Sequence, residues 1–193
     1  REVLGAARTL PGGDPAMPGR IECEVLQRFA WADGISARLS DTYRGGMTTS
    51  FVLSALAIVC GISYEPFAGP ESKWLFATGE FLLLAAILVI IWRGEKARWH
   101  KRWFETRRVG EYFRHAPILL LMGVARPPGR WPKGTDTSWP EYYARHGLRE
   151  PGLPRVTVTA AYLREALGGL LHEHAVSQRD YHLGKAARLT KVH

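Results

Sequence analysis

The sequence predicts an all-α membrane protein in which a two-helix transmembrane hairpin continues through long helices into a cytoplasmic helical bundle. Two apolar runs, residues 47–63 and 74–92, predict the hairpin. A basic segment with two tryptophans, residues 93–115, follows the second run directly and predicts the long continuation. The rest of the chain is polar and arginine-rich, so the net charge is +8 even though the apolar runs carry almost no charge.

The second run is the stronger of the two predicted spans. It has 19 residues, a tryptophan at each end and one charged residue, Glu80. About 20 apolar residues cross the hydrocarbon core of a bilayer, and tryptophans gather at its interfaces. The first run, with 17 residues, is at the short end of this range. The connecting segment 64–73 contains Pro66, Gly69 and Pro70, which predict an antiparallel turn.

The first run also carries a line of small residues at helical spacing. They are Ser50, Ser54, Ala57 and Gly61. Small residues let helices approach closely in lipid, so this line predicts the face of the first span that packs against another helix.

The distribution of lysine and arginine predicts the orientation. Six of these residues precede residue 47, one (Lys73) lies between the runs, and nineteen follow residue 92. Cytoplasmic segments carry the excess of basic residues, so both termini are expected in the cytoplasm. The partner of the basic residues after the second run is then the lipid bilayer, and no nucleic acid is expected. These residues are Arg93, Lys96, Arg98, Lys101 and Arg102.

The chain divides into four predicted regions. Residues 1–20 form a Gly/Pro-rich linker, which could tether a soluble domain, and residues 21–46 form a cytoplasmic lead-in helix. Residues 47–92 form the two-span transmembrane hairpin, and residues 93–193 form the cytoplasmic helical region. The pair Gly45–Gly46 predicts a soft joint just before the membrane.

The second span is expected to continue as a single helical rod over residues 74–115, roughly 60 Å long at 1.5 Å per residue. Within it, Arg107 and Glu111 are spaced to form an ion pair. Pro117 is expected to end or kink this rod. The apolar segment 118–124 is too short to cross a membrane and is expected to pack in the cytoplasmic bundle.

The last third of the chain is expected to contain a loop and two further helices. Residues 125–137 are rich in proline and glycine and predict a loop, after which Ser138 caps a short helix. Thr157 or Thr159 is expected to begin the last helix. A stripe along that helix is apolar at first and turns polar halfway, and it is expected to bury against other helices. It comprises Leu163, Leu167, Leu170, His174, Ser177 and Tyr181.

No catalytic constellation, cofactor motif or metal-binding pattern is evident. The pair His172 and His174 points to different faces of a helix, and two cysteines make neither a disulfide framework nor a zinc site. Glu80 is the candidate functional residue, because a charge inside a span is costly and usually faces protein or water. It predicts either the lining of a pore or vestibule, or a structural carboxyl that is hydrogen-bonded to a neighbouring helix or paired with Lys73 two turns away.

Five stretches carry a resemblance that covers most of the chain from residue 32 onward. They are ADGISARLSDTYRGG, KWLFATGEFLLLAAILVI, WHKRWFETRRVGEYFRH, GLPRVTVTAAYL and SQRDYHLGKAARL. Through them the chain resembles the SLATT-like family, the SMODS- and SLOG-associating two-transmembrane effector domains of bacterial nucleotide-signalling defence systems. Two departures from the family pattern are Gly110, where alanine is expected, and Gly45–Gly46, where bulkier residues are expected.

The resemblance implies a set of motif positions that join the membrane helices to the cytoplasmic bundle. They are Trp99, His100, Trp103, Arg107, Glu111, Arg114, Gln178, Tyr181 and His182. It further implies a homo-oligomeric, pore-forming effector in the bacterial inner membrane, gated by a nucleotide-sensing domain outside this chain.

Three other classes of function are alternatives to the pore. A membrane anchor and oligomerisation scaffold would show every one of these sequence features. It differs from a pore only in that the Glu80 carboxylate need not contact water. An enzyme using His182 or His100 lacks any partner constellation, so no enzymatic activity is expected. A nucleic-acid binder is disfavoured because the basic residues gather where the membrane face is predicted.

Overall fold

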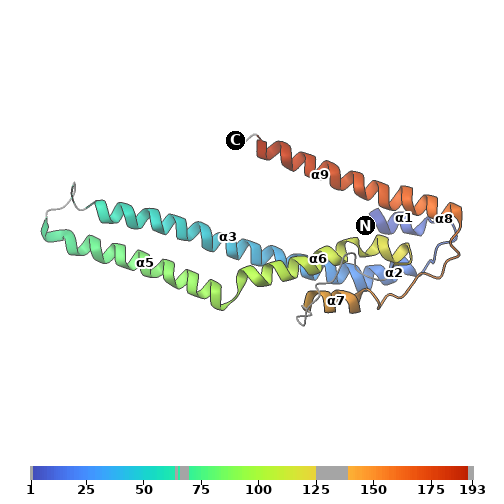
Figure 1. The fold of residues 1–193 in the computed structure, drawn as a ribbon, viewed down its shortest axis with the longest axis horizontal. Coiled ribbons are helices and arrows are strands. Elements are labelled where there is room, and N and C mark those ends of the chain that lie inside the picture. Colours follow the sequence, from blue (N-terminus) through green and yellow to red (C-terminus); the bar gives the residue numbers. More distant parts are fainter. Residues whose placement is uncertain (1, 64, 66–69, 125–138, 191–193) are drawn as a thin grey trace, which may run out of the picture. The chain divides into compact units, whose positions relative to one another are not determined.

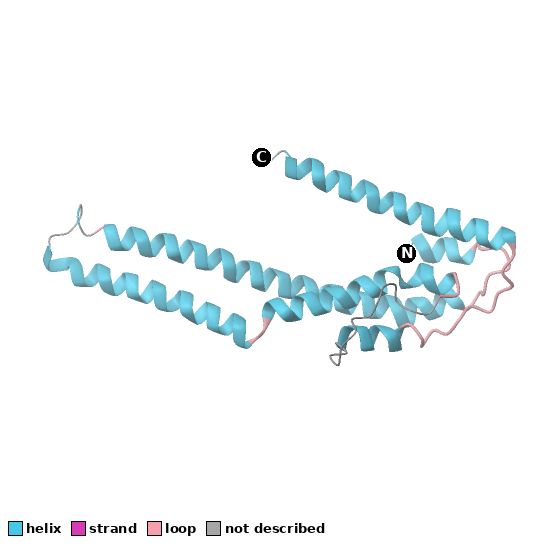
Figure 2. Cartoon of the chain, in the orientation of Figure 1, coloured by secondary structure: helices cyan, strands magenta, loops and turns pink. Residues whose placement is uncertain are grey.

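The structure is a computed structural model that describes residues 2–63, 65, 70–124 and 139–190. In these residues every regular element is a helix and no strand occurs, so the all-helical prediction is confirmed (Figures 1 and 2). The elements are α1 (Glu2–Arg8), α2 (Met17–Arg20), α3 (Gln27–Ile62), α5 (Lys73–Lys96), α6 (Trp99–Leu121), α7 (Trp139–Gly147), α8 (Ala160–Glu165) and α9 (Glu173–Thr190), with π-helical segments over Ile21–Leu26 and Ala166–His172 and a short 3₁₀ turn over Pro70–Ser72.

The chain forms two compact units. Unit 1 comprises Arg1–Ala32 and Arg108–His193, and unit 2 comprises Asp33–Arg107. Unit 2 therefore includes both predicted spans together with residues on either side of them.

Two helices are long and apolar enough to cross a membrane. They are the helical stretch Met17–Ile62, with 46 residues, and α5, with 24 residues. None of the residues of α5 is buried, and Phe81 and Leu88 leave 68% and 66% of their surfaces exposed. An apolar helix with an uncovered surface is unlike the core helix of a water-soluble protein, which buries its apolar face.

In unit 2, α5 lies antiparallel beside the second half of α3 (Figure 1). Near one end Gly46 faces Ile90, and near the other the Cys60 thiol donates to the Phe76 carbonyl at 3.4 Å. The side chains of α3 that are not fully exposed recur at alternating spacings of three and four, the spacing of coiled-coil packing. They include Ser36, Leu39, Tyr43, Gly46, Ser50, Leu53, Ala57 and Cys60.

The predicted small-residue face of the first span is largely correct. Ala57 is buried, and Ser50 and Gly61 are half-buried. Ser54 is the exception, since it is exposed and its hydroxyl donates to the Ser50 carbonyl of its own helix.

The position of the break between helices differs from the prediction. The helix α3 runs through Gly45–Gly46 without interruption, so the soft joint predicted there is wrong. The predicted continuous rod over 74–115 is wrong as well, because α5 ends at Lys96 and α6 begins at Trp99. Arg98 between them has a φ of 49°, the left-handed conformation that stops a helix.

Unit 1 has a hydrophobic core that begins in the first twenty residues. The linker predicted over 1–20 is wrong, because α1 and α2 lie there and the side chains of Leu4, Leu10 and Met17 are buried. Pro18, one of the residues that indicated a linker, lies in the first turn of α2, where proline is well tolerated. The core members are Leu4, Ala7, Leu10, Met17, Ile21, Val25, Ala32, Val109, Phe113, Ala116, Ile118, Leu120, Leu121, Leu148, Tyr162, Ala166 and Leu170.

The end of α6 closes this core. Pro117 lies inside α6 and does not end it, since the helix continues to Leu121. Ile118, Leu120 and Leu121 are buried, as expected for a segment too short to span a membrane. The loop predicted over 125–137 and the cap predicted at Ser138 lie outside the described residues.

The last helical stretch begins where predicted but presents a different face. The Thr159 hydroxyl accepts a hydrogen bond from the Tyr162 amide and caps α8. The buried side chains are those of Tyr162, Ala166 and Leu170, whereas Leu163 and Leu167 are 41% and 45% exposed. Only the Leu170 part of the predicted apolar stripe is therefore correct.

Candidate functional site

Glu80 lies at the seam between the two apolar helices. Its carboxylate packs against Gly61 of α3, where a Cβ atom would come within 2.9 Å of Oε2. Gly61 thus forms a notch that holds the Glu80 side chain. Gly79 of α5 forms a second such notch for Cys60 of α3, since a Cβ atom at position 79 would lie 3.0 Å from the Cys60 sulfur. Glycine at these positions gives the side chain of the facing helix room to enter the seam. Glu80 is thus half-buried against its neighbouring helix, in contrast to the exposed Phe81 beside it.

At the turn between α5 and α6, two further glycines form a notch that holds the indole of Trp99. A Cβ atom at Gly94 would lie 3.2 Å from the indole, and one at Gly46 would lie 3.3 Å from it. The Ala97 amide donates to the Arg93 carbonyl and the Arg98 amide to the Glu95 carbonyl, which completes the turn. The indole can lie over Gly94 because the left-handed residue Arg98 breaks the helix and bends the chain between α5 and α6.

The first turns of α6 bring the motif residues His100 and Trp103 together around Tyr43 of α3. The Tyr43 ring lies 5.2 Å from the His100 ring and 6.0 Å from the Trp103 ring, measured between centroids. The Arg44 guanidinium lies 5.9 Å from the centre of the Trp103 ring, within the range of a cation–π contact. Trp99, His100 and Trp103 therefore form one aromatic joint, which packs α6 against α3. Their role in this joint is structural.

The other motif residues lie further along α6 and on α9. Arg107 is exposed, and Glu111 pairs with Arg114 at 3.3 Å instead of with Arg107 as predicted. Arg114 also lies 5.7 Å from the centre of the Phe29 ring. On α9, Gln178 is half-buried while Tyr181 and His182 are exposed, with their two rings 5.4 Å apart.

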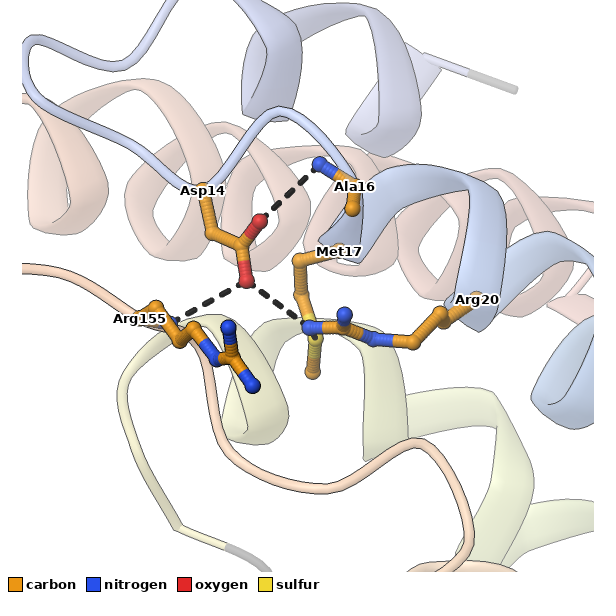
Figure 3. Close-up of polar contacts among 5 residues, drawn as sticks. All are labelled: Asp14, Ala16, Met17, Arg20 and Arg155. Atoms are coloured by element: carbon orange, nitrogen blue, oxygen red, sulfur yellow. Dashed lines mark hydrogen bonds and ion pairs between the residues drawn. The ribbon is translucent and has the colours of Figure 1, made fainter.

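Asp14 is a structural residue that the sequence reasoning missed. Its carboxylate accepts hydrogen bonds from the Ala16 amide at 2.9 Å, from the Arg20 guanidinium at 2.8 Å and from the Arg155 amide at 3.1 Å (Figure 3). The bonds from Arg155 and Ala16 lower the pKa of this carboxyl below its usual value. Asp14 thereby ties the start of α2 to the segment that leads into α8, across 141 residues of sequence.

A second buried carboxylate joins α6 to α7. Glu141 is 4% exposed, and its Oε1 accepts hydrogen bonds from the Arg108 guanidinium at 2.9 Å and from the Tyr112 hydroxyl at 3.4 Å. Nearby, Arg28 forms an ion pair with Glu150 and donates to the Gly147 carbonyl. These long-range contacts gave no signal in the sequence because neither carboxylate lies near its partner along the chain.

Two histidines of unit 1 lie against each other. The rings of His115 and His174 are 5.5 Å apart, and Nε2 of His174 is buried with no hydrogen-bond partner among the described residues. Burial, and then the neighbouring His174, lower the pKa of His115 below its ordinary value of 6.5. No group of three or more potential metal ligands is found in the described part of the chain.

We expect unit 1 to lose stability as the pH falls below about 6.5. The folded state favours neutral His115, while the unfolded chain takes up the proton near its ordinary pKa, so the contribution is complete above that pKa and declines below it. Scanning calorimetry between pH 7.5 and 5.5 measures the unfolding temperature. His115→Asn, which removes the titrating group, should flatten this dependence; an unchanged slope in that variant would assign the loss to other groups.

Comparisons with protein-family models, curated proteins and solved structures find no significant match to this chain.

Proposed function

We propose that this chain is the membrane part of an oligomeric effector that forms a pore. The observation that carries the proposal is α5, a 24-residue apolar helix without a single buried residue. Exposing such a surface to water is unfavourable, whereas a bilayer covers it. In this proposal α3 and α5 form a two-span transmembrane hairpin of the bacterial inner membrane.

The orientation follows from the basic residues on both sides of the hairpin. Nineteen lysines and arginines follow residue 92, whereas the segment between the two apolar runs has one, Lys73, at the start of α5. Both termini and unit 1 are then cytoplasmic. The SLATT-like resemblance adds the expectation of a soluble nucleotide-sensing domain, outside this chain, that gates the membrane part.

A pore requires several copies of the chain. A helix is about 10 Å across, so two helices cannot enclose an aqueous path. The chain therefore acts as a homo-oligomer, with Glu80 of each copy near the seam of its hairpin. Opening the seam between Gly61 and Glu80 would turn the carboxylates toward a shared central path.

Replacing Glu80 with glutamine is expected to change cation flux. A carboxylate roughly 8 Å from a passing ion, at an effective dielectric constant of about 20, contributes about 2 kcal/mol. Its loss should reduce cation flux, or the preference for cations over anions, roughly thirtyfold. Flux is measured in liposomes that contain the purified oligomer. Glu165→Gln, the same change at an exposed position of α8, is the control and should leave flux unchanged.

The packing of Glu80 against Gly61 also favours a second candidate function, a membrane anchor that clusters soluble domains. In an anchor of this kind, the Glu80 carboxylate only helps to hold the two helices together, and no ion crosses the membrane. Oligomeric chains that produce no flux in liposomes would favour the anchor, and equal flux from the wild type and Glu80→Gln would assign Glu80 a structural role.

A further inference from the structure

A cavity of about 380 Å³ opens in unit 2 beside the turn between α5 and α6. Met47, Ile90, Ile91 and the indole of Trp99 form its apolar wall. Met47 lies in the middle of α3, Ile90 and Ile91 lie near the end of α5, and Trp99 begins α6. The cavity is thus apolar on the side that faces the proposed hydrocarbon core.

Charged side chains also line this cavity, and they follow the apolar part of α5 along the chain. Arg98 and Lys101 are exposed cations, and Glu95 is the one carboxylate among the lining residues. Lys101 lies 3.9 Å from Glu105, a loose contact that leaves its ammonium free to turn to another anion. The charged side is therefore basic overall.

The shape of the cavity depends on the break at Arg98. The left-handed conformation of Arg98 sets its side chain at the turn, next to the start of α6, whose first amides attract negative charge. Glycine at positions 46 and 94 leaves room for the indole that forms the cavity wall. An uninterrupted α5–α6 rod would not bring Trp99 over Gly94.

We propose that this cavity binds one anionic phospholipid, with an acyl chain against the apolar wall and the phosphate between Arg98 and Lys101. The assignment rests on the membrane insertion proposed above. The apolar wall distinguishes a lipid from a free phosphate, and the two cations distinguish an anionic headgroup from a zwitterionic one.

The test uses the full chain reconstituted in vesicles of equal parts phosphatidylglycerol and phosphatidylcholine. Native mass spectrometry after gentle detergent release counts the lipids of each kind that stay bound. The wild type should retain phosphatidylglycerol in preference, and the double variant Arg98→Gln/Lys101→Gln should lose this preference by roughly thirtyfold. The matched control, Lys185→Gln/Arg188→Gln on the exposed end of α9, should retain it.

A second variant tests the cavity without changing charge. Ser50→Leu fills space beside the apolar wall and should reduce bound phosphatidylglycerol, while circular dichroism confirms unchanged helicity. Equal retention of both lipids by membrane-inserted wild type would overturn the lipid site alone, as would displacement of the lipid by free glycerol phosphate. Wild type that does not enter the vesicles would instead overturn the proposed membrane function.

Discussion

Leu82→Arg is expected to release the chain from membranes. Leu82 lies near the middle of the second apolar run and is 61% exposed. An arginine at the centre of a span costs about 3 kcal/mol, which lowers the ratio of inserted to extracted chain roughly a hundredfold. The fraction that resists alkaline carbonate extraction measures this change.

The structure offers a closely matched control for this substitution. Leu183 on α9 is also 61% exposed, so Leu183→Arg makes the same change on a helix surface that is expected to face water. There an exposed substitution should alter stability by no more than about 0.5 kcal/mol and leave extraction unchanged. Equal behaviour of the two variants would mean that α5 is not surrounded by lipid.

Phe113→Ala is expected to have the largest effect on unit 1. Phe113 is fully buried, its ring lies 5.9 Å from that of Tyr143, and a Cβ atom at Gly147 would come within 2.7 Å of its Cζ atom. A ring packed this closely leaves a large void when it is removed, with a cost of about 3–5 kcal/mol. Native-state hydrogen exchange of the amides 109–121 reports this loss without unfolding unit 2.

The control for Phe113 lies nine residues earlier on the same helix. Phe104 is 51% exposed and contacts the rings of His100 and Trp103. Phe104→Ala should therefore cost less than about 1 kcal/mol and leave the exchange of residues 109–121 unchanged. If both variants exchanged alike, the core of unit 1 would not be centred on Phe113.

The sequence predicts the helices best where the signal is local. The two apolar runs, the cap at Thr159 and the burial of the segment after Pro117 all follow from neighbouring residues. The covered side of α6 also follows a local pattern, since the half-buried Trp99 and Trp103 and the buried Thr106 and Phe113 lie at helical spacing.

The features that the sequence did not predict depend on contacts between distant residues. The break at Arg98 allows Trp99 to pack on Gly46, which lies more than fifty residues earlier. The linker prediction failed because it relied on the glycines and prolines of the first twenty residues, whereas a few apolar side chains there decide the burial of the segment. The stripe of the last helix failed because the π-helical segment Ala166–His172 changes the helical phase.

In the candidate site, too, local features are predictable from the sequence and contacts between distant residues are not. Glu80 stands out in the sequence as the one charge in an apolar run, but the notch at Gly61 is visible only in the structure. The motif residues His100 and Trp103 meet around Tyr43, and on α9 the rings of Tyr181 and His182 lie against each other. A spacing pattern can identify helix faces, but it does not indicate which faces meet.

The sidedness of two cysteines tests the membrane hairpin most directly. In a Cys60→Ser background, the natural Cys23 precedes the first span and Glu65→Cys places a thiol between the two spans. A membrane-impermeant maleimide applied to intact spheroplasts should label the thiol at position 65 and reach Cys23 only after permeabilisation. Labelling of both thiols under the same condition, or recovery of the chain in the soluble fraction, would contradict a two-span membrane protein with cytoplasmic termini.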